Sequence, residues 1–439
     1  MTSKLGTLAV ALVCGVLTTR LIVGTAGPGA FALYTLLTAI PAMFIFLDLG
    51  SGAAVVNGVA TSTDTRHDEE LVTTVTTVWH IILAFALALA LGDILVLVTG
   101  TWPRILGEAG RQPGAALAAT ACVLVFCGSV ALAIWQRLLL GLGKNHLIVL
   151  LQGLQAPLNL LVVWLLVSRP AGPLTAYLAL GSFIAALVVA GCGVFVAHRL
   201  TAPLLSTVRR RLPEVRRHPG TRVMDVGWPM LAQVLASPLA IGLQRYLLAQ
   251  DGSEHDVAEY GVLGQVFFAV LGVIAAAGLA LWPAFAQARA SGRLRRGPFL
   301  LAAGFAGGTA TATMLVWAVR GPLFAFITHG AIDVAGSHVL LFGAMVTTQA
   351  ALYPLGMFIM DREGLRFQVM PVVLMVASTI ALTLLLTPSL GVSGPLVAST
   401  VSTVLFQIIP FSAYIRRHRD RLWGGGGALP RPPATAAIR

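Results

Sequence analysis

The sequence predicts an all-α polytopic membrane protein with about twelve transmembrane helices in two six-helix lobes. Hydrophobic residues make up 57% of the 439 residues and charged residues only 10%, and the mean hydropathy is +0.86. A soluble domain of this length would lack the polar residues needed to cover its surface. Apolar runs long enough to cross a hydrocarbon core of about 30 Å recur from one end of the chain to the other.

Twelve such runs follow one another along the chain. Each is expected to be a helix, because in lipid every backbone polar group needs a partner within the protein. The expected helices cover about 5–26, 31–58, 71–99, 116–138, 147–168, 174–198, 223–249, 259–288, 298–319, 335–360, 369–388 and 395–415.

The distribution of basic residues predicts the orientation, since Lys and Arg in short loops stay on the cytoplasmic side. With the N-terminus inside, 23 Lys and Arg residues fall on the cytoplasmic side and four on the other. Arg137 and Lys144 are counted among the cytoplasmic ones. Both termini are therefore expected in the cytoplasm. The net charge of +12 follows from this asymmetry and from anionic lipid headgroups, so we expect no nucleic-acid partner.

Several classes of site are not indicated. The four cysteines lie in apolar runs without metal-ligand spacing, which predicts neither a disulfide nor a metal site. No nucleotide motif occurs, and we expect no cofactor. The longest outer loops, near 100–115 and 320–334, are too short to carry the catalytic residues of a polytopic glycosyltransferase or polymer ligase. We therefore expect a transporter and not an enzyme.

Weak internal similarity indicates a duplication. A shift of 222 residues places the Gly-Pro-Leu at 172–174 on that at 394–396, and a shift of 229 brings Arg20 to within about one helical turn of Arg245. Two halves that both begin inside are parallel repeats. The predicted division is an N-terminal lobe (1–198), a basic linker (199–222), a C-terminal lobe (223–415) and a disordered tail (416–439) that is rich in Gly and Pro.

Arg20 and Arg245 are the two basic residues inside apolar runs, each late in the first run of its half. An arginine in the membrane interior costs at least about 2.5 kcal/mol unless it faces a partner or a wet cavity. The pair predicts a cationic binding site for an anionic substrate. Arg20 can alternatively extend outward or pair with Asp93, and Arg245 can extend outward near Asp251.

Other intramembrane polar residues are candidates with structural alternatives. Gln152, Gln155 and Asn159 share one helix face, as do Gln349 and Tyr353. They can bind sugar hydroxyls, although hydrogen bonds between helices are the commoner role. Asp48 and Asp93 are candidate coupling carboxylates. Asp48 can titrate during transport, bond a neighbouring helix or remain protonated.

The order of several short motifs resembles a known family. The resemblance is carried by Arg20, the Gly- and Tyr-containing stretch 27–34, the D-x-G element at 46–50, and Ala258-Glu259-Tyr260-Gly261. These are similar to the polysaccharide flippases of the multidrug/oligosaccharidyl-lipid/polysaccharide (MOP) exporter superfamily. The likeness covers residues 5–415.

The resemblance implies a MATE-like MOP flippase fold in a bacterial plasma membrane. It further implies that the substrate is a polyprenyl-(di)phosphate-linked glycan, flipped from the cytoplasmic to the outer leaflet, with a glycan polymerase or glycosyltransferases as partners. A cation-coupled multidrug exporter of the same superfamily is the alternative. A major-facilitator carrier is disfavoured, because the loop at 61–70 lacks the G-x-x-x-D-R motif of that class. The glycan, the coupling ion and the oligomeric state stay open.

Overall fold

The structure, a computed structural model, describes residues 2–44, 52–61, 68–168, 173–212, 242–279, 281–290 and 297–423. In these ranges the regular elements are all helical. Ten of the described helical segments are long and apolar enough to span a membrane. The predicted fold class, an all-α multi-pass membrane protein, is confirmed.

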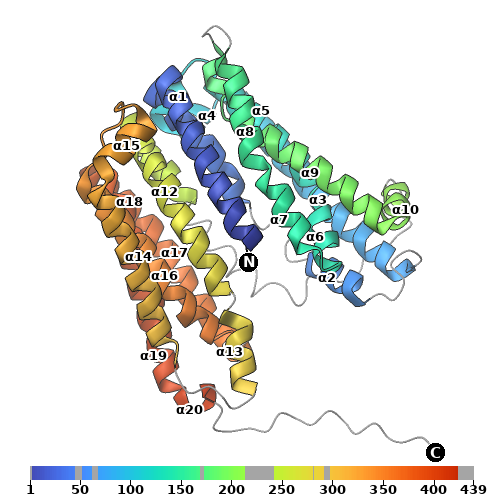
Figure 1. The fold of residues 1–439 in the computed structure, drawn as a ribbon. Coiled ribbons are helices and arrows are strands. Elements are labelled where there is room, and N and C mark those ends of the chain that lie inside the picture. The colour runs from blue at the N-terminus through green and yellow to red at the C-terminus, as the bar shows by residue number, and fades with distance from the viewer. Residues whose placement is uncertain are drawn as a thin grey trace, which may run out of the picture.

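The helices form two groups that meet at one end and diverge toward the other (Figure 1). We call the meeting end, near α1, α4 and α15, the closed end. The other, near α10, α13 and α20, is the open end.

The first half of the chain supplies α1 to α10. Their bounds are α1 Thr2–Met43, α2 Gly52–Thr61, α3 Glu69–Val98, α4 Trp102–Leu106, the 3-10 turn η1 Gly107–Arg111, α5 Ala115–Ala131, α6 Ile134–Gly141, α7 Asn145–Gly153, α8 Gln155–Val167, the 3-10 turn η2 Pro173–Tyr177, α9 Leu180–Thr201 and α10 Leu204–Arg211.

The second half begins with a helix at residues 242–251. It continues with α12 Glu254–Leu279, α13 Leu281–Ala290, α14 Phe299–Ala318, α15 Arg320–Thr328, α16 Gly336–Phe358, α17 Arg362–Leu390, α18 Ser393–Thr403, the π-helical turn η3 Val404–Ile408, α19 Ile409–Arg417 and α20 Arg419–Leu422.

Helix α1 is a hairpin of two legs. Gly27 has φ of 85°, a left-handed value that favours glycine, and Pro28 follows it. Both legs lie against α12: Thr19 donates to Gln265 at 2.5 Å, while Gly261, one turn earlier, touches Thr35. The first leg corresponds to the expected span 5–26, and the second leg, which ends at Met43, to the first part of the expected span 31–58; α2 covers the end of that span. Of the expected span 223–249, the structure describes only residues from 242 onward.

Exposed side chains are apolar on a membrane-spanning helix and basic on a helix of the expected cytoplasmic linker, as the sequence pattern predicts. On α3, Leu87, Leu91 and Leu95 recur every four residues and are about three-fifths exposed, at 61%, 59% and 63%, as expected for a face in contact with lipid. In the expected linker, α10 buries Leu204, Leu205 and Val208 and leaves its arginines at the open end. The linker therefore contains an amphipathic helix.

Part of the segment expected to be a disordered tail is ordered. Residues 419–422 form α20, in which Leu422 is buried and Arg421 pairs with Asp361 at 3.2 Å. The Gly/Pro-rich residues 424–439 lie outside the described part of the chain.

Candidate functional site

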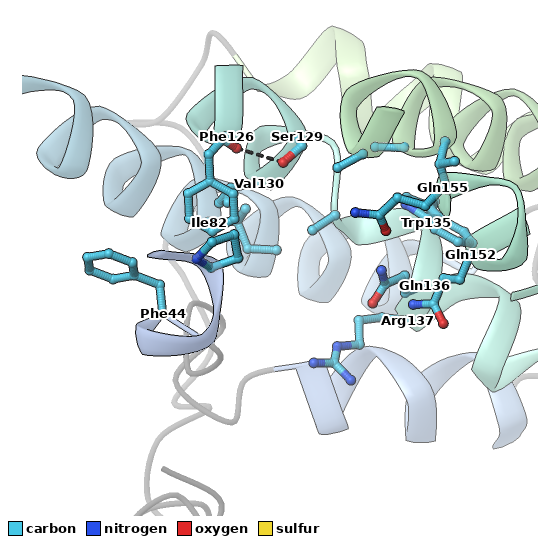
Figure 2. Close-up of a pocket in the computed structure, with 15 residues that line it drawn as sticks. Phe44, Ile82, Phe126, Ser129, Val130, Trp135, Gln136, Arg137, Gln152 and Gln155 are labelled. Carbon is cyan, nitrogen blue, oxygen red and sulfur yellow. Dashed lines mark hydrogen bonds between the residues drawn. The ribbon is translucent and has the colours of Figure 1, made fainter. Parts of the chain in front are cut away.

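A cavity of about 230 Å³ lies inside the first half, between α1, α3 and α5 to α9, and we call it the N-half cavity. Figure 2 shows two kinds of wall. Phe44, Ile82 and Phe126 form an apolar side, while Gln136, Arg137 and the amides of α7 and α8 form a polar side. The cavity thus combines aromatic and aliphatic surface with a guanidinium and carboxamides.

Two helix breaks build this cavity. The span expected at 116–138 is interrupted between α5 and α6, at Leu132 and Ala133. The Ala131 carbonyl lies at this break and accepts a hydrogen bond from the indole of Trp79 at 2.8 Å. The next span breaks at Leu154, between α7 and α8, where Pro157 cannot donate to the carbonyl four residues back. The breaks turn the side chains of α6 and α8 toward the cavity.

The three glutamines of the polar side are available for a ligand. Gln136, Gln152 and Gln155 make no hydrogen bond to any residue that the structure describes. Each carboxamide has two donor hydrogens and an acceptor oxygen, which suits sugar hydroxyls. Arg137 is half-buried beside them, and among the described residues no acidic side chain lines the cavity.

Trp135 is held rigidly under the polar side. Its side chain is 1% exposed, and its ring lies on the backbone of Gly193 in α9. A Cβ at Gly193 would lie 2.2 Å from the ring, closer than packed atoms approach. Only glycine therefore leaves the indole in place.

The two predicted intramembrane arginines lie elsewhere, at the junction of the halves. Arg20 of α1 donates to the Phe326 carbonyl of α15 and lies over that ring at 4.5 Å. Arg245 donates in the opposite direction, to the Thr35 carbonyl of α1 at 3.0 Å. Each half thus contributes one arginine that bonds the main chain of the other half near the closed end.

Comparison with known proteins identifies the family of this chain. The family model described as polysaccharide biosynthesis protein matches residues 1–289, well over half of the chain. The chain belongs to this family. Its N-half cavity and its arginine pair are therefore features of a polysaccharide biosynthesis protein. No curated protein matches the chain.

Several solved structures share the fold of this chain at low sequence identity. An inward-facing multidrug resistance MATE transporter of the MOP superfamily has a TM-score of 0.63 and 16% identity, covering 95% of this chain and 98% of its own. The lipid II flippase MurJ, in an inward closed conformation, has a TM-score of 0.59 and 11% identity, covering 94% and 87%. A MATE protein in a bent conformation gives 0.59 and 14%, covering 96% and 94%. The predicted MOP fold is confirmed.

In this family member the remaining polar candidates occupy different places. Asn159 donates to the Tyr34 hydroxyl at 2.9 Å, and so joins α8 to the second leg of α1. Gln349 donates to Thr403 at 3.2 Å within the second half. Tyr353 packs on Gly278 of α12. Of the predicted glycan-binding residues, Gln152 is the one that reaches the cavity, together with its neighbour Gln155.

Of the two candidate coupling carboxylates, the structure describes Asp93. Asp93 is 4% exposed, and neither of its oxygens has a hydrogen-bond partner among the described residues. It lines an apolar cavity with Trp102, which donates instead to Thr120 at 3.0 Å. Arg20 does not pair with it. Asp48 lies outside the described residues.

The hydropathy pattern gives Gln136 no role, and it places Arg137 at the cytoplasmic end of the straight span expected at 116–138. A hydropathy run gives no sign of a helix break that lacks proline. The one feature of the sequence that points to this polar wall is a Gln-Arg pair within an apolar run, one to two helical turns before the loop at 142–144.

Proposed function

We propose that this polysaccharide biosynthesis protein flips a lipid-linked oligosaccharide precursor from the cytoplasmic to the outer leaflet by alternating access. The observation that carries the proposal is the N-half cavity, in which one guanidinium and three carboxamides without a hydrogen-bond partner among the described residues face aromatic and aliphatic surface. Family membership supports the same substrate class.

The chemistry of the cavity matches the two parts of such a head group. A phosphate or diphosphate cannot enter a low-dielectric region without a paired cation. Arg137 can supply that cation, and its planar fork binds two phosphate oxygens at once. Gln136, Gln152 and Gln155 can then replace the water around sugar hydroxyls. Arg137 is the charged side chain among the described residues that line the cavity, and a guanidinium attracts anions rather than the cations that a multidrug exporter carries.

The arrangement of the halves supports alternating access. They meet at the closed end and diverge toward the open end (Figure 1). The exposed Arg209 and Arg210 of α10 lie at the open end, which by the charge rule is cytoplasmic. A head group entering from the cytoplasm would reach the cavity there. Exchange of the open and closed ends would release it outside.

A flipping assay tests the proposal. Purified protein in vesicles is given a fluorescent polyprenyl-diphosphate oligosaccharide, and its arrival in the outer leaflet is followed with an impermeant quencher. Loss of a charge-assisted hydrogen bond of about 1.5–3 kcal/mol predicts that Arg137→Ala flips about 10- to 100-fold more slowly. Gln152→Leu should be slowed less. Arg210→Ala is the matched control and should be unaffected.

Two results would contradict the proposal. One is a wild-type protein that moves the glycan lipid no faster than protein-free vesicles. The other is an Arg137→Ala variant at the wild-type rate. Proton-driven accumulation of lipophilic cations by the wild type, without glycan flipping, would favour the multidrug exporter instead.

A further inference from the structure

The second half is packed with apolar side chains where the internal repeat would place the polar side of the N-half cavity. The shift of 222 residues that relates the halves carries Gln136 and Arg137 to Phe358 and Ile359. Both of these side chains are fully buried, at 0% exposure. They belong to an apolar cluster with buried residues from α13, α14, α16, α19 and α20, which we call the C-half cluster. Packed hydrocarbon thus replaces the guanidinium and carboxamides of the first half.

The end of the described chain completes the C-half cluster. Leu422 of α20 is 1% exposed within it. Trp423 follows, and its ring centroid lies 5.0 Å from that of Phe358. The same indole lies so close to Gly297, just before α14, that a Cβ there would be 2.6 Å from it. A terminal segment therefore supplies two large apolar side chains to the interior of the second half.

Ion pairs hold the same segment against the start of α17. Arg421 pairs with Asp361 at 3.2 Å and with Glu363. Asp361 precedes α17 and Glu363 lies in its first turn, so the pairs tie the chain end to the connection between α16 and α17. Partly exposed ion pairs stabilise weakly, whereas burial of Leu422 and Trp423 removes apolar surface from water. The apolar contacts therefore supply most of the attachment, and the ion pairs fix its position.

This attachment lies at the open end of the molecule. Figure 1 shows α20 there, beside α13 and α19. The cluster beneath it includes Ala302, which is 6% exposed and lies within the first turn of α14. The segment thus covers the end of the second half that is cytoplasmic by the charge rule.

We propose that residues 418–423 are a strap that seals the cytoplasmic end of the second half over the C-half cluster. The strap keeps this half closed at the end where the first half holds the N-half cavity. The cytoplasmic ends of the two halves are therefore unequal, one with a cavity and the other with a sealed core. This device does not depend on the identity of the substrate, so it stands apart from the proposed function.

The access of a water-soluble thiol reagent to the C-half cluster tests the strap. The purified full-length protein, with its four native cysteines replaced, carries Ala302→Cys as a reporter. It should react about tenfold or more slowly than Arg366→Cys, an exposed position, because a thiol needs solvent access to react. Leu422→Asp places an unpaired carboxylate in the cluster, so it should release the strap and speed the reporter about tenfold or more. Arg417→Asp is the matched control: it places the same carboxylate on an exposed residue of α19 and should leave the rate unchanged.

Two further variants separate release of the strap from unfolding. Gly297→Leu fills the position of the Trp423 ring without altering the strap itself, and it should also speed the reporter. Ala118→Cys, at 0% exposure in the first half, should stay unreactive in every variant. An unchanged rate at Ala302→Cys in Leu422→Asp would overturn the inference, as would a fast rate with the strap intact. Acceleration at both reporters would indicate general unfolding and would overturn it as well.

Discussion

Replacing Arg245 by Met should shift the balance between the two conformations of the protein. The guanidinium donates to the Thr35 carbonyl at 3.0 Å and lies 5.9 Å and 5.8 Å from the rings of Tyr260 and Phe268. Met keeps much of the apolar stem and removes the charge. Since the bond to Thr35 joins the two halves at the closed end, it stabilises the arrangement in Figure 1 and is absent when that end opens.

The size of the effect follows from the lost contacts. A hydrogen bond from a charged donor contributes about 1.5–3 kcal/mol. The two rings belong to the same half as Arg245, so their contacts with the guanidinium are present in both conformations. They therefore do not contribute to the free-energy difference between the conformations. The expected shift is therefore about 2 kcal/mol, or about 30-fold in the ratio of the conformations.

Distance measurements between the halves detect this shift. Spin labels at His146 and Arg366, both exposed, report the separation of the two halves, after the four native cysteines have been replaced. Arg245→Met should enrich the population with the shorter open-end distance. Arg199→Met is the matched control, because Arg199 lies over Phe195 of its own helix at 5.1 Å. Identical distance distributions for wild type and Arg245→Met would refute a cross-half role for this arginine.

Three further outcomes are expected. Cysteine at Arg111 should react with an impermeant thiol reagent added outside cells, whereas cysteine at Arg210 should not; the reverse would overturn the orientation. Gly193→Ala forces the indole beneath it to move, so it should destabilise the protein by about 1–3 kcal/mol in thermal unfolding and slow flipping, while Gly191→Ala, with open space at its Cβ, should be neutral. Asp48→Asn removes a titratable group, so it should weaken transport driven by an imposed pH gradient without weakening substrate binding; an unaltered rate and gradient dependence would exclude proton coupling there.

Much of the fold is predictable from the sequence because membrane insertion imposes one pattern on it. Spans need about twenty apolar residues and internal hydrogen bonds, so composition and length locate them. The weak internal repeat also predicted that Arg20 and Arg245 are equivalent, and the structure places them in reciprocal contacts across the junction.

The candidate site was harder to predict, because it depends on departures from a straight helix. The break after Ala131 has no proline, and the Trp79 side chain that accompanies it is 52 residues away in the sequence. Similar depth in the membrane left a pair between Arg20 and Asp93 open as an alternative, but the two residues line different recesses of the first half. Lateral position around a bundle is set by packing, which one sequence does not reveal.

The two arginine bonds across the junction share a property with consequences for genetics. Both acceptors are main-chain carbonyls, so no side-chain replacement at Thr35 or Phe326 deletes the acceptor itself. A mutational scan would register the donors Arg20 and Arg245 and, for their acceptors, only indirect effects such as loss of the Phe326 ring under Arg20. Second-site suppressors of the arginine variants should therefore arise at residues that reposition backbone, such as Gly27 in the turn of α1, and not at the acceptor side chains.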